Sequence, residues 1–199
     1  MVSVVIPTNE SEHLLVRTLA CLVSGATAGL IREVILADSG STDDTARVGD
    51  VAGCKFMRLP GPLGPRLSAA AHAARGQWLL FLRPGCVLQP GWVDEVTQFL
   101  ESAPDGIAAS FAPAPPRPQM RSSLLQELME VWRSRRAAPS PERGLLISRQ
   151  LYREMQGHAD LADPEADLLR RIGKRRIAML RTGASLHAER KASHPEQSP

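Results

Sequence analysis

The stretch QWLLFLRPGCVL, residues 77–88, contains an unbroken apolar run from Trp78 to Leu82 that ends at a Pro-Gly pair. A run of this length, bounded by glycine and proline, is typical of a central strand that is buried on both faces. In open α/β sheets, ligands bind outside the carboxyl ends of the strands. The sequence therefore predicts that the residues after Leu82 meet a substrate, and the first of them is the cation Arg83.

Strand-like and helix-like segments alternate through the first half of the chain. Such alternation is the signature of βαβ units, and it predicts an α/β fold: a Rossmann-like, mostly parallel sheet flanked by helices on both faces. The expected strands lie at 2–6, 34–37, 54–59 and 78–82, and the expected helices at 14–25, 67–75 and 89–100, with another helix beginning at a cap on Ser41 or Thr42.

The second half of the chain is less regular. We expect a single domain over residues 1–188 and a polar, mobile tail over 189–199. The sequence predicts strands at 107–111, 144–148 and 177–180, helices at 150–155 and 164–173, an extended proline-rich connection at 113–118 and an amphipathic helix at 120–132.

Composition limits the class of partner. The 199 residues carry a net charge of only +3, which fits a protein that handles anionic small molecules. Aromatic residues make up 4% of the chain, and no recognisable nucleic-acid-binding module is present, so we expect no nucleic-acid partner.

The number and spacing of the cysteines, and the lengths of the apolar runs, indicate the cellular compartment of the protein. Cys21, Cys54 and Cys86 are odd in number and far apart, which predicts neither a disulfide framework nor a metal cluster. No apolar run approaches the roughly 20 residues of a membrane-spanning helix, and the N-terminus lacks the features of a signal peptide. We expect a cytoplasmic protein.

The basic run at 170–176 has two interpretations. It could make peripheral contact with a membrane, or it could be a solvated helix end.

Three blocks of sequence together resemble glycosyltransferase family 2, the inverting enzymes of the GT-A fold. The first block, VSVVIPTNESEHLLVRTL at 2–19, resembles the opening strand, turn and helix of the family. The second, EVILADSGSTDDTARV at 33–48, resembles its second strand and Asp-x-Gly-Ser-x-Asp turn, and the third is RLSAAAHAARGQWLLFL at 66–82. The likeness extends over roughly residues 2–187.

The resemblance implies a cleft for a nucleotide-sugar donor of the UDP or GDP type. Asp38 would hold the base or the ribose, since a carboxylate can accept hydrogen bonds from either. The alternative is that Asp38 is a turn residue that satisfies its own backbone. The other donor-binding positions that the resemblance implies are Pro7, Thr8, Asn9 and Glu10 beside the nucleoside, and Ser68, which aligns with an asparagine of the family.

The chain departs from the family at the end of the central strand. Family members usually carry Asp-x-Asp there, which holds a divalent cation, Mg²⁺ or Mn²⁺, on the donor diphosphate. Here Arg83 and Gly85 occupy the two positions, and neither can ligate a metal. In one interpretation Arg83 replaces the metal and transfer is metal-independent. In another, the domain is non-catalytic and acts as a nucleotide-binding regulator or a scaffold for a protein partner. In the third, Arg83 is a solvated residue before a turn.

The resemblance also implies a base for an unknown hydroxyl acceptor. RGLLISRQLYREMQGH at 143–158 and ADPEADLLRRI at 162–172 resemble the acceptor side of the family. Glu165 takes the position of the catalytic aspartate, and Asp163 would take it if the loop were shifted by two residues. Alternatively, these acidic residues only stabilise a helix N-terminus. His187 aligns near the diphosphate, or is a packing residue.

Overall fold

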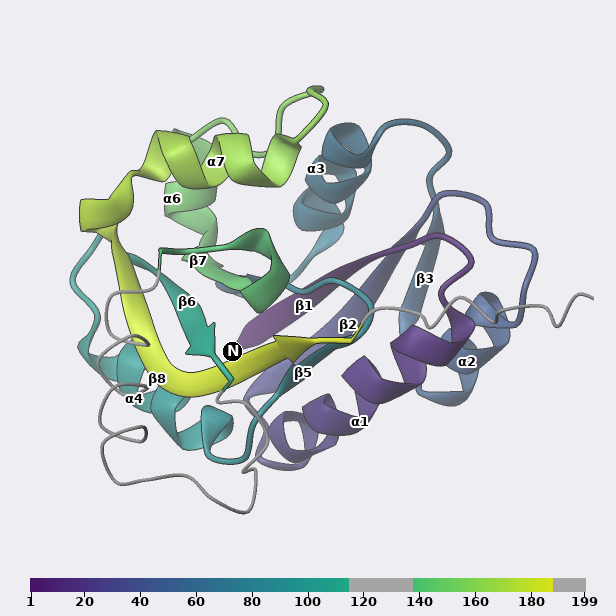
Figure 1. Cartoon of the computed structure of the whole chain (residues 1–199), viewed down its shortest axis with the longest axis horizontal. Helices are drawn as coiled ribbons and strands as arrows, with labels where there is room; N and C mark the ends of the chain where they lie inside the picture. The colour runs from purple at the N-terminus through teal and green to yellow at the C-terminus, as the bar shows by residue number, and fades with distance from the viewer. Residues whose placement is uncertain (115–137, 188–199) are drawn as a thin grey trace, which may run out of the picture.

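The computed structural model describes residues 1–114 and 138–187 (Figure 1). Its strands are β1 (Val2–Thr8), β2 (Ile31–Asp38), β3 (Lys55–Arg58), β4 (Trp78–Phe81), β5 (Cys86–Leu88), β6 (Ala108–Pro113), β7 (Leu145–Ser148) and β8 (Ile177–Leu186). Its helices are α1 (Glu12–Thr27), α2 (Thr45–Val51), α3 (Leu63–Ala73), α4 (Trp92–Ser102), α6 (Arg149–Glu154) and α7 (Pro164–Ile172), with 3₁₀ turns η1 (Pro141–Arg143) and η2 (Lys174–Arg176). The predicted helix at 120–132, most of the proline-rich connection and the predicted tail lie outside the described residues.

All eight strands belong to one sheet in the order β3-β2-β1-β4-β7-β6-β8-β5. Neighbours are parallel in the pairs β1–β2, β1–β4, β2–β3 and β6–β8, and antiparallel in β4–β7, β6–β7 and β5–β8. The predicted α/β fold with a mostly parallel sheet is therefore confirmed. The division of the chain into one domain and a tail stays a prediction.

The central strand is buried on both faces, as its apolar run predicts. Leu80 and Leu82 belong to a core cluster that also contains residues of α1 and α4. Leu79 and Phe81 point to the opposite cluster, which contains residues of α3, α6 and α7. Figure 1 shows these two groups of helices on either side of the sheet. Because successive side chains of a strand alternate between faces, a run of apolar residues can serve both cores.

The structure differs from the sequence prediction at several elements. The short strand β5 was not predicted, and β8 runs to Leu186 instead of ending at 180. These two segments pair with each other in antiparallel fashion, a long-range contact that the local pattern does not reveal. Helix α3 begins at Leu63, before the predicted 67, because Pro62 is its N-cap and Pro65 lies in its first turn, where a missing N–H is tolerated. Helix α2 is capped by Asp44, not by Ser41 or Thr42.

The loop after β4 is fixed from two sides. Gly85 donates its backbone N–H to the Thr18 hydroxyl at 2.9 Å and lies close to the Leu14 carbonyl of α1. Its own carbonyl accepts from the N–H of His187, at the end of β8, at 3.0 Å. Arg83 thus leaves the sheet from a segment that is held by both α1 and β8.

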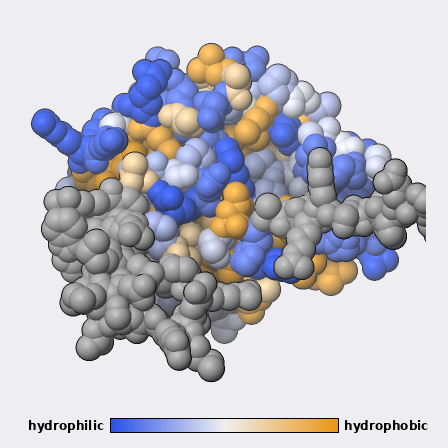
Figure 2. All heavy atoms as spheres, viewed as in Figure 1, coloured by the Kyte–Doolittle hydropathy of each residue, from blue (hydrophilic) through white to orange (hydrophobic). Residues whose placement is uncertain are grey.

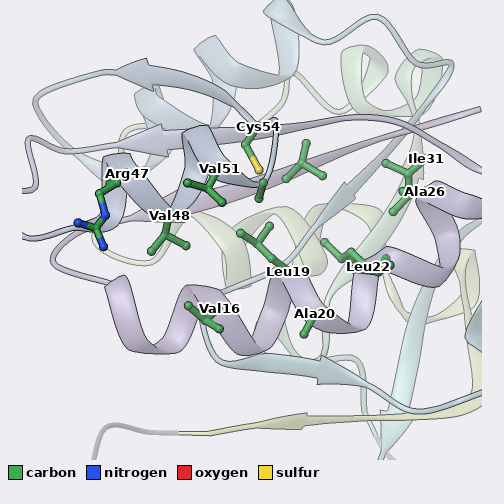
Figure 3. A pocket seen from close by; sticks show the side chains of 13 residues that line it. Val16, Leu19, Ala20, Leu22, Ala26, Ile31, Arg47, Val48, Val51 and Cys54 are labelled. Atoms are coloured by element: carbon green, nitrogen blue, oxygen red, sulfur yellow. The ribbon is translucent and has the colours of Figure 1, made fainter.

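A hollow lies between α1 and α2, away from the loop after β4 (Figure 3). Its volume is about 490 Å³, and its walls are almost wholly apolar. Val16, Val23 and Val51 on its rim are exposed to solvent.

In the described ranges, no helix is both long enough and apolar enough to cross a membrane. The cytoplasmic location stays a prediction.

Gly64 allows α3 to approach the segment that leads into α7. A Cβ atom added to Gly64 would lie 1.9 Å from the carbonyl oxygen of Ala159 and 3.2 Å from the Cβ of Pro164. Because one neighbour is backbone, the clash cannot be relieved by a side-chain rotation.

We therefore expect Gly64→Ala to lower the free energy of unfolding by about 1–3 kcal/mol, which is the usual cost of overpacking. Urea denaturation followed by circular dichroism measures this change. Helix propensity alone would make the same substitution stabilising by up to about 1 kcal/mol. A variant that is as stable as the wild type, or more stable, would contradict the close approach of α3 to Ala159.

Candidate active site

An open pocket of about 340 Å³ lies at the carboxyl ends of β1 and β4. Its volume is within the usual range for small-molecule sites. Segments that are distant in the sequence meet there: the end of β1 with the start of α1, the first turn of α3, the loop after β4, the start of α7 and the end of β8. The lining residues are Pro7, Thr8, Asn9, Ser11, Leu14, Leu63, Arg66, Arg83, Pro84, Glu165, Leu186 and His187.

The pocket brings together many, but not all, of the residues that the sequence predicts for the site. Pro7, Thr8, Asn9, Arg83 and Glu165 line it, and so does His187. Glu10, Asp38, Ser68 and Asp163 are not among its lining residues.

Arg83 and Glu165 form an ion pair inside the pocket. The Arg83 Nε donates to Glu165 Oε2 at 2.8 Å, and Arg83 Nη2 donates to the same oxygen. The Glu165 side chain is 8% exposed and that of Arg83 is 33% exposed, so the carboxylate lies deeper than the guanidinium. In the described parts of the chain, no group donates a hydrogen bond to Glu165 Oε1. This second carboxylate oxygen is therefore the one that can take up a proton.

The electrostatics of the pair follow from burial. Burial raises the pKa of Glu165 above its ordinary value, Arg83 opposes this shift, and the nearby charge of Asp163 adds to it. Burial lowers the pKa of Arg83, but Glu165, with smaller contributions from Asp163 and Glu142, outweighs burial and the net shift is upward. Arg83 is consequently always charged, whereas Glu165 is tuned toward proton uptake.

Helix α7 positions Glu165. Its N-cap is Asp163, whose Oδ1 accepts from the N–H of Ala166 at 3.0 Å, so this carboxylate caps the helix. Farther along, Arg171 donates to Asp167 Oδ2 at 2.7 Å and to the carbonyl of Gly157 at 2.6 Å. The bond to Gly157 ties the end of the helix to the loop after α6.

Asp38 is held by its own turn and by the neighbouring strand β1. Its Oδ1 accepts from the hydroxyls of Thr8 at 2.9 Å and Ser41 at 2.5 Å, and its Oδ2 accepts from the backbone N–H groups of Gly40 and Ser41. Asp38 is fully buried. Burial alone would raise its pKa, but the hydrogen bonds from Ser41, Gly40 and Thr8 outweigh burial and lower it. In this structure Asp38 acts as a turn residue, the alternative that the sequence leaves open, and direct contact with a nucleoside stays a prediction.

Glu10 and Ser68 also have other surroundings than the pocket. Glu10 has a left-handed backbone conformation, with φ of 47°, and its carboxylate accepts from the N–H groups of Thr42 and Asp43. It thereby connects the turn after β1 to the turn after β2. Ser68 lies farther along α3 than the pocket-lining Leu63 and Arg66. The donor-binding roles of Glu10 and Ser68 stay predictions.

Sequence reasoning missed Arg66 as a member of the site. Arg66 Nη1 donates to the carbonyls of Thr8 at 3.1 Å and Ala37 at 2.9 Å, at the ends of β1 and β2. Its side chain lines the pocket together with Arg83. The sequence offered no signal for it, because the helix was predicted to begin at 67 and only the structure places Arg66 in the first turn of α3.

The residues at this edge do not fit a divalent cation. Arg83 brings a positive charge to one of the two positions at which the resemblance implies aspartate. At the other, Gly85 has φ of 85°, and a Cβ there would lie 2.4 Å from the His187 carbonyl oxygen. Within 1–114 and 138–187, no three His, Cys, Asp or Glu side chains are grouped as a metal site would need.

The basic run that ends α7 is only partly exposed to solvent. Figure 2 shows hydrophilic residues gathered over α7 and the turn that follows it. The Arg170 side chain is 76% exposed and pairs with Asp167 at 2.5 Å. The Arg171 side chain, by contrast, is 26% exposed and donates to the Gly157 carbonyl. The pocket does not include this run, and peripheral contact with a membrane stays a prediction.

Comparison with known proteins places these features in a family. The family model described as Glycosyl transferase family 2 matches residues 3–144. The chain is 32% identical, over 154 residues, to validoxylamine A glucosyltransferase of Streptomyces hygroscopicus subsp. limoneus, which covers 71% of this chain and 34% of that protein. It is 30% identical, over 107 residues, to putative polypeptide N-acetylgalactosaminyltransferase 13 of Drosophila melanogaster. This match covers 46% of this chain and 19% of that protein. The chain thus spans about a third or less of the length of these curated relatives.

Solved structures show the same fold. Glucosyl-3-phosphoglycerate synthase from Mycobacterium tuberculosis, in complex with Mn²⁺ and UDP-glucose, aligns with a TM-score of 0.69 and 20% identity, over 96% of this chain and 72% of that one. TarS of S. aureus, residues 1–349 in complex with UDP, aligns with a TM-score of 0.65 and 17% identity, over 90% and 57%. These similarities confirm the predicted GT-A fold.

The turn around Asp38 generates a stability prediction. In Asp38→Asn an amide NH₂ replaces one oxygen, and at least one of the four donors around the side chain loses its acceptor. We expect the free energy of unfolding to fall by about 1–3 kcal/mol at neutral pH. Asp44→Asn is the matched control, because Asp44 is 52% exposed and its ion pair with Arg47 spans 3.7 Å. Urea denaturation measures both variants.

The effect of Asp38→Asn should depend on pH. Because the folded-state pKa of Asp38 is lowered, its charge stabilises the fold above the unfolded pKa of about 3.9, and this stabilisation is lost as the pH falls toward the folded pKa. The difference between wild type and variant should therefore shrink in acid. A difference that is constant from pH 7 to pH 3 would contradict the role of the charged carboxylate.

Proposed function

The chain belongs to glycosyl transferase family 2, and from that premise we propose that it transfers a sugar from a nucleotide-diphosphate donor to a hydroxyl acceptor with inversion. One observation carries the proposal: the buried carboxylate of Glu165 and the guanidinium of Arg83 form a pair in the pocket that Thr8 also lines. A proton acceptor and a cation for the leaving group are thus placed at one edge of the sheet, where α/β folds bind their ligands.

The donor class is supported by the relatives. The solved structures of similar fold include complexes with UDP and with UDP-glucose, and one curated relative is named as a glucosyltransferase. In the proposed complex a UDP- or GDP-type nucleoside lies along Pro7, Thr8 and Asn9, and the diphosphate extends toward Arg83. Small-molecule sites of this volume are usually largely pre-formed.

The proposed transfer requires one proton acceptor. The acceptor oxygen attacks the anomeric carbon of the sugar and gives its proton to Glu165, while the bond from that carbon to the phosphate oxygen breaks. The electron pair leaves with the nucleoside diphosphate, and attack from the opposite face inverts the configuration. Glu165 Oε1, to which no described group donates, is the oxygen that receives the proton.

Arg83 links the leaving group to the base. Its guanidinium can bind phosphate oxygens in the same charge-assisted way in which it binds Glu165, and it stabilises the charge that develops on the diphosphate. When Arg83 turns toward the phosphate, Glu165 loses the charge that opposes its upward pKa shift. Donor binding in this way strengthens the base. Because the residues at positions 83 and 85 do not fit a metal ion, we propose that transfer is metal-independent.

The alternative of a non-catalytic regulator or scaffold is not favoured. The family match extends over the strands and loops that form most of the pocket.

Titration calorimetry with UDP and GDP, in the presence and absence of Mn²⁺, tests donor binding. We expect the wild type to bind at least one of them, and release of the nucleoside diphosphate from the matching sugar nucleotide, with water as acceptor, gives a rate. Glu165→Gln should lower this rate about 100- to 10,000-fold, the usual contribution of a general base. Glu101→Gln, on the exposed face of α4, is the control. If the wild type binds neither nucleotide, the proposed function is wrong.

Arg83→Met tests the link between cation and base through the pH profile. The base works in its deprotonated form, so kcat/KM, which reports the free enzyme in which Arg83 still contacts Glu165, rises with pH through the pKa of Glu165. Removal of Arg83 removes the influence that lowers this pKa, and the acidic limb of the profile should therefore move to higher pH. The maximal rate should also fall, because the leaving group loses its cation. An unshifted acidic limb would show that Arg83 does not tune the base.

A further inference from the structure

The pocket contains a second cation, Arg66, for which the proposed function has no role so far. Resting on that proposed function, we propose that Arg66 is a fixed binding residue for the phosphates of the donor. It would hold the diphosphate before Arg83 leaves Glu165. The ligand class is a nucleoside diphosphate, recognised through its phosphate charge in addition to its nucleoside.

The geometry of Arg66 is set by the sheet. Nη1 bridges the carbonyls of Thr8 and Ala37, which end two neighbouring parallel strands. A guanidinium is planar and rigid, so two hydrogen bonds on one nitrogen fix the direction of the others. In residues 1–114 and 138–187, no group accepts from Nη2, and this nitrogen stays available to a ligand in the pocket that the Arg66 side chain lines.

The charge of Arg66 is not neutralised by a direct partner. No carboxylate of the described residues lies within 4.0 Å of it, whereas Arg83 is paired with Glu165. The nearest influence is the charge of Asp38, which raises the Arg66 pKa against the larger lowering effect of burial. Arg66 and Arg83 against Glu165 leave the lining of the pocket with an excess of one positive charge. Such a pocket attracts an anion.

The position is also unfavourable to a cation in the absence of a ligand. Arg66 lies in the first turn of α3, which contains no acidic residue, and its Nε is buried without a hydrogen-bond partner. Both features oppose a charge there. A bound phosphate offsets them, because guanidinium–phosphate hydrogen bonds are among the strongest in proteins and are frequently bidentate.

Calorimetry with uridine and UDP, or guanosine and GDP if the wild type prefers them, separates a phosphate contact from a structural one. In Arg66→Met we expect the diphosphate to bind about 10- to 100-fold more weakly, as for loss of a charged hydrogen-bonding group, while the nucleoside binds within about twofold of the wild type. Arg66→Lys keeps the positive charge but not the planar guanidinium, and its affinity for the diphosphate should fall less than that of Arg66→Met. Arg75→Met is the control, because Arg75 pairs with Glu33 at 3.3 Å, outside the pocket.

Two results would overturn the inference. One is a diphosphate affinity that Arg66→Met leaves unchanged; the other is an equal loss for nucleoside and diphosphate, which would make Arg66 only a clamp on the ends of β1 and β2. If Arg66→Met does not fold, the same comparison in Arg66→Lys decides. A wild type that binds neither UDP nor GDP contradicts the proposed function itself, whereas a wild type that binds while Arg66→Met binds equally well contradicts this inference alone.

Discussion

The ion pair between Arg83 and Glu165 is the interaction on which the site depends. It joins the end of the central strand to the start of α7, 82 residues farther along the chain. A carboxylate that is 8% exposed needs a partner, because an isolated buried charge is strongly unfavourable. Removing Arg83 would leave this carboxylate without its partner, which is unfavourable. The same contact therefore holds α7 against the sheet and sets the proton affinity of the candidate base.

Local patterns predicted the framework of the fold and the membership of much of the site. The apolar run at 78–82 indicated the central strand, because a strand that is buried on both faces consists of consecutive apolar residues. The pairing of β5 with β8 left no such trace, since it depends on where two distant segments meet. For the same reason, Arg83 and Glu165 were each predicted for the site, with separate roles, but their direct contact was not.

Asp38 and Arg66 show where a motif and a site diverge. The turn motif around Asp38 predicted a ligand contact or a turn residue, and in the structure three of its four hydrogen bonds come from its own turn and the fourth from Thr8 of β1. Arg66 belongs to no motif of the resemblance, yet it lines the pocket. Its hydrogen-bond acceptors, the Thr8 and Ala37 carbonyls, belong to β1 and β2. Only the assembled sheet brings a helix residue to these two strand ends.

The exchange of carboxylates for an arginine and a glycine changes the electrostatics of the whole pocket. A metal site concentrates negative charge and binds phosphate through the ion, whereas this pocket carries its own positive excess and can bind phosphate directly. An aspartate at position 83 would face Glu165 as a like charge, and it would raise the pKa of that carboxylate further instead of opposing its shift. At position 85, the left-handed backbone and the nearby His187 carbonyl exclude a side chain without a local rearrangement. Arg83 and Glu165 are thus physically interdependent, and neither position 83 nor position 85 would become a metal ligand by a single substitution without disturbing its surroundings.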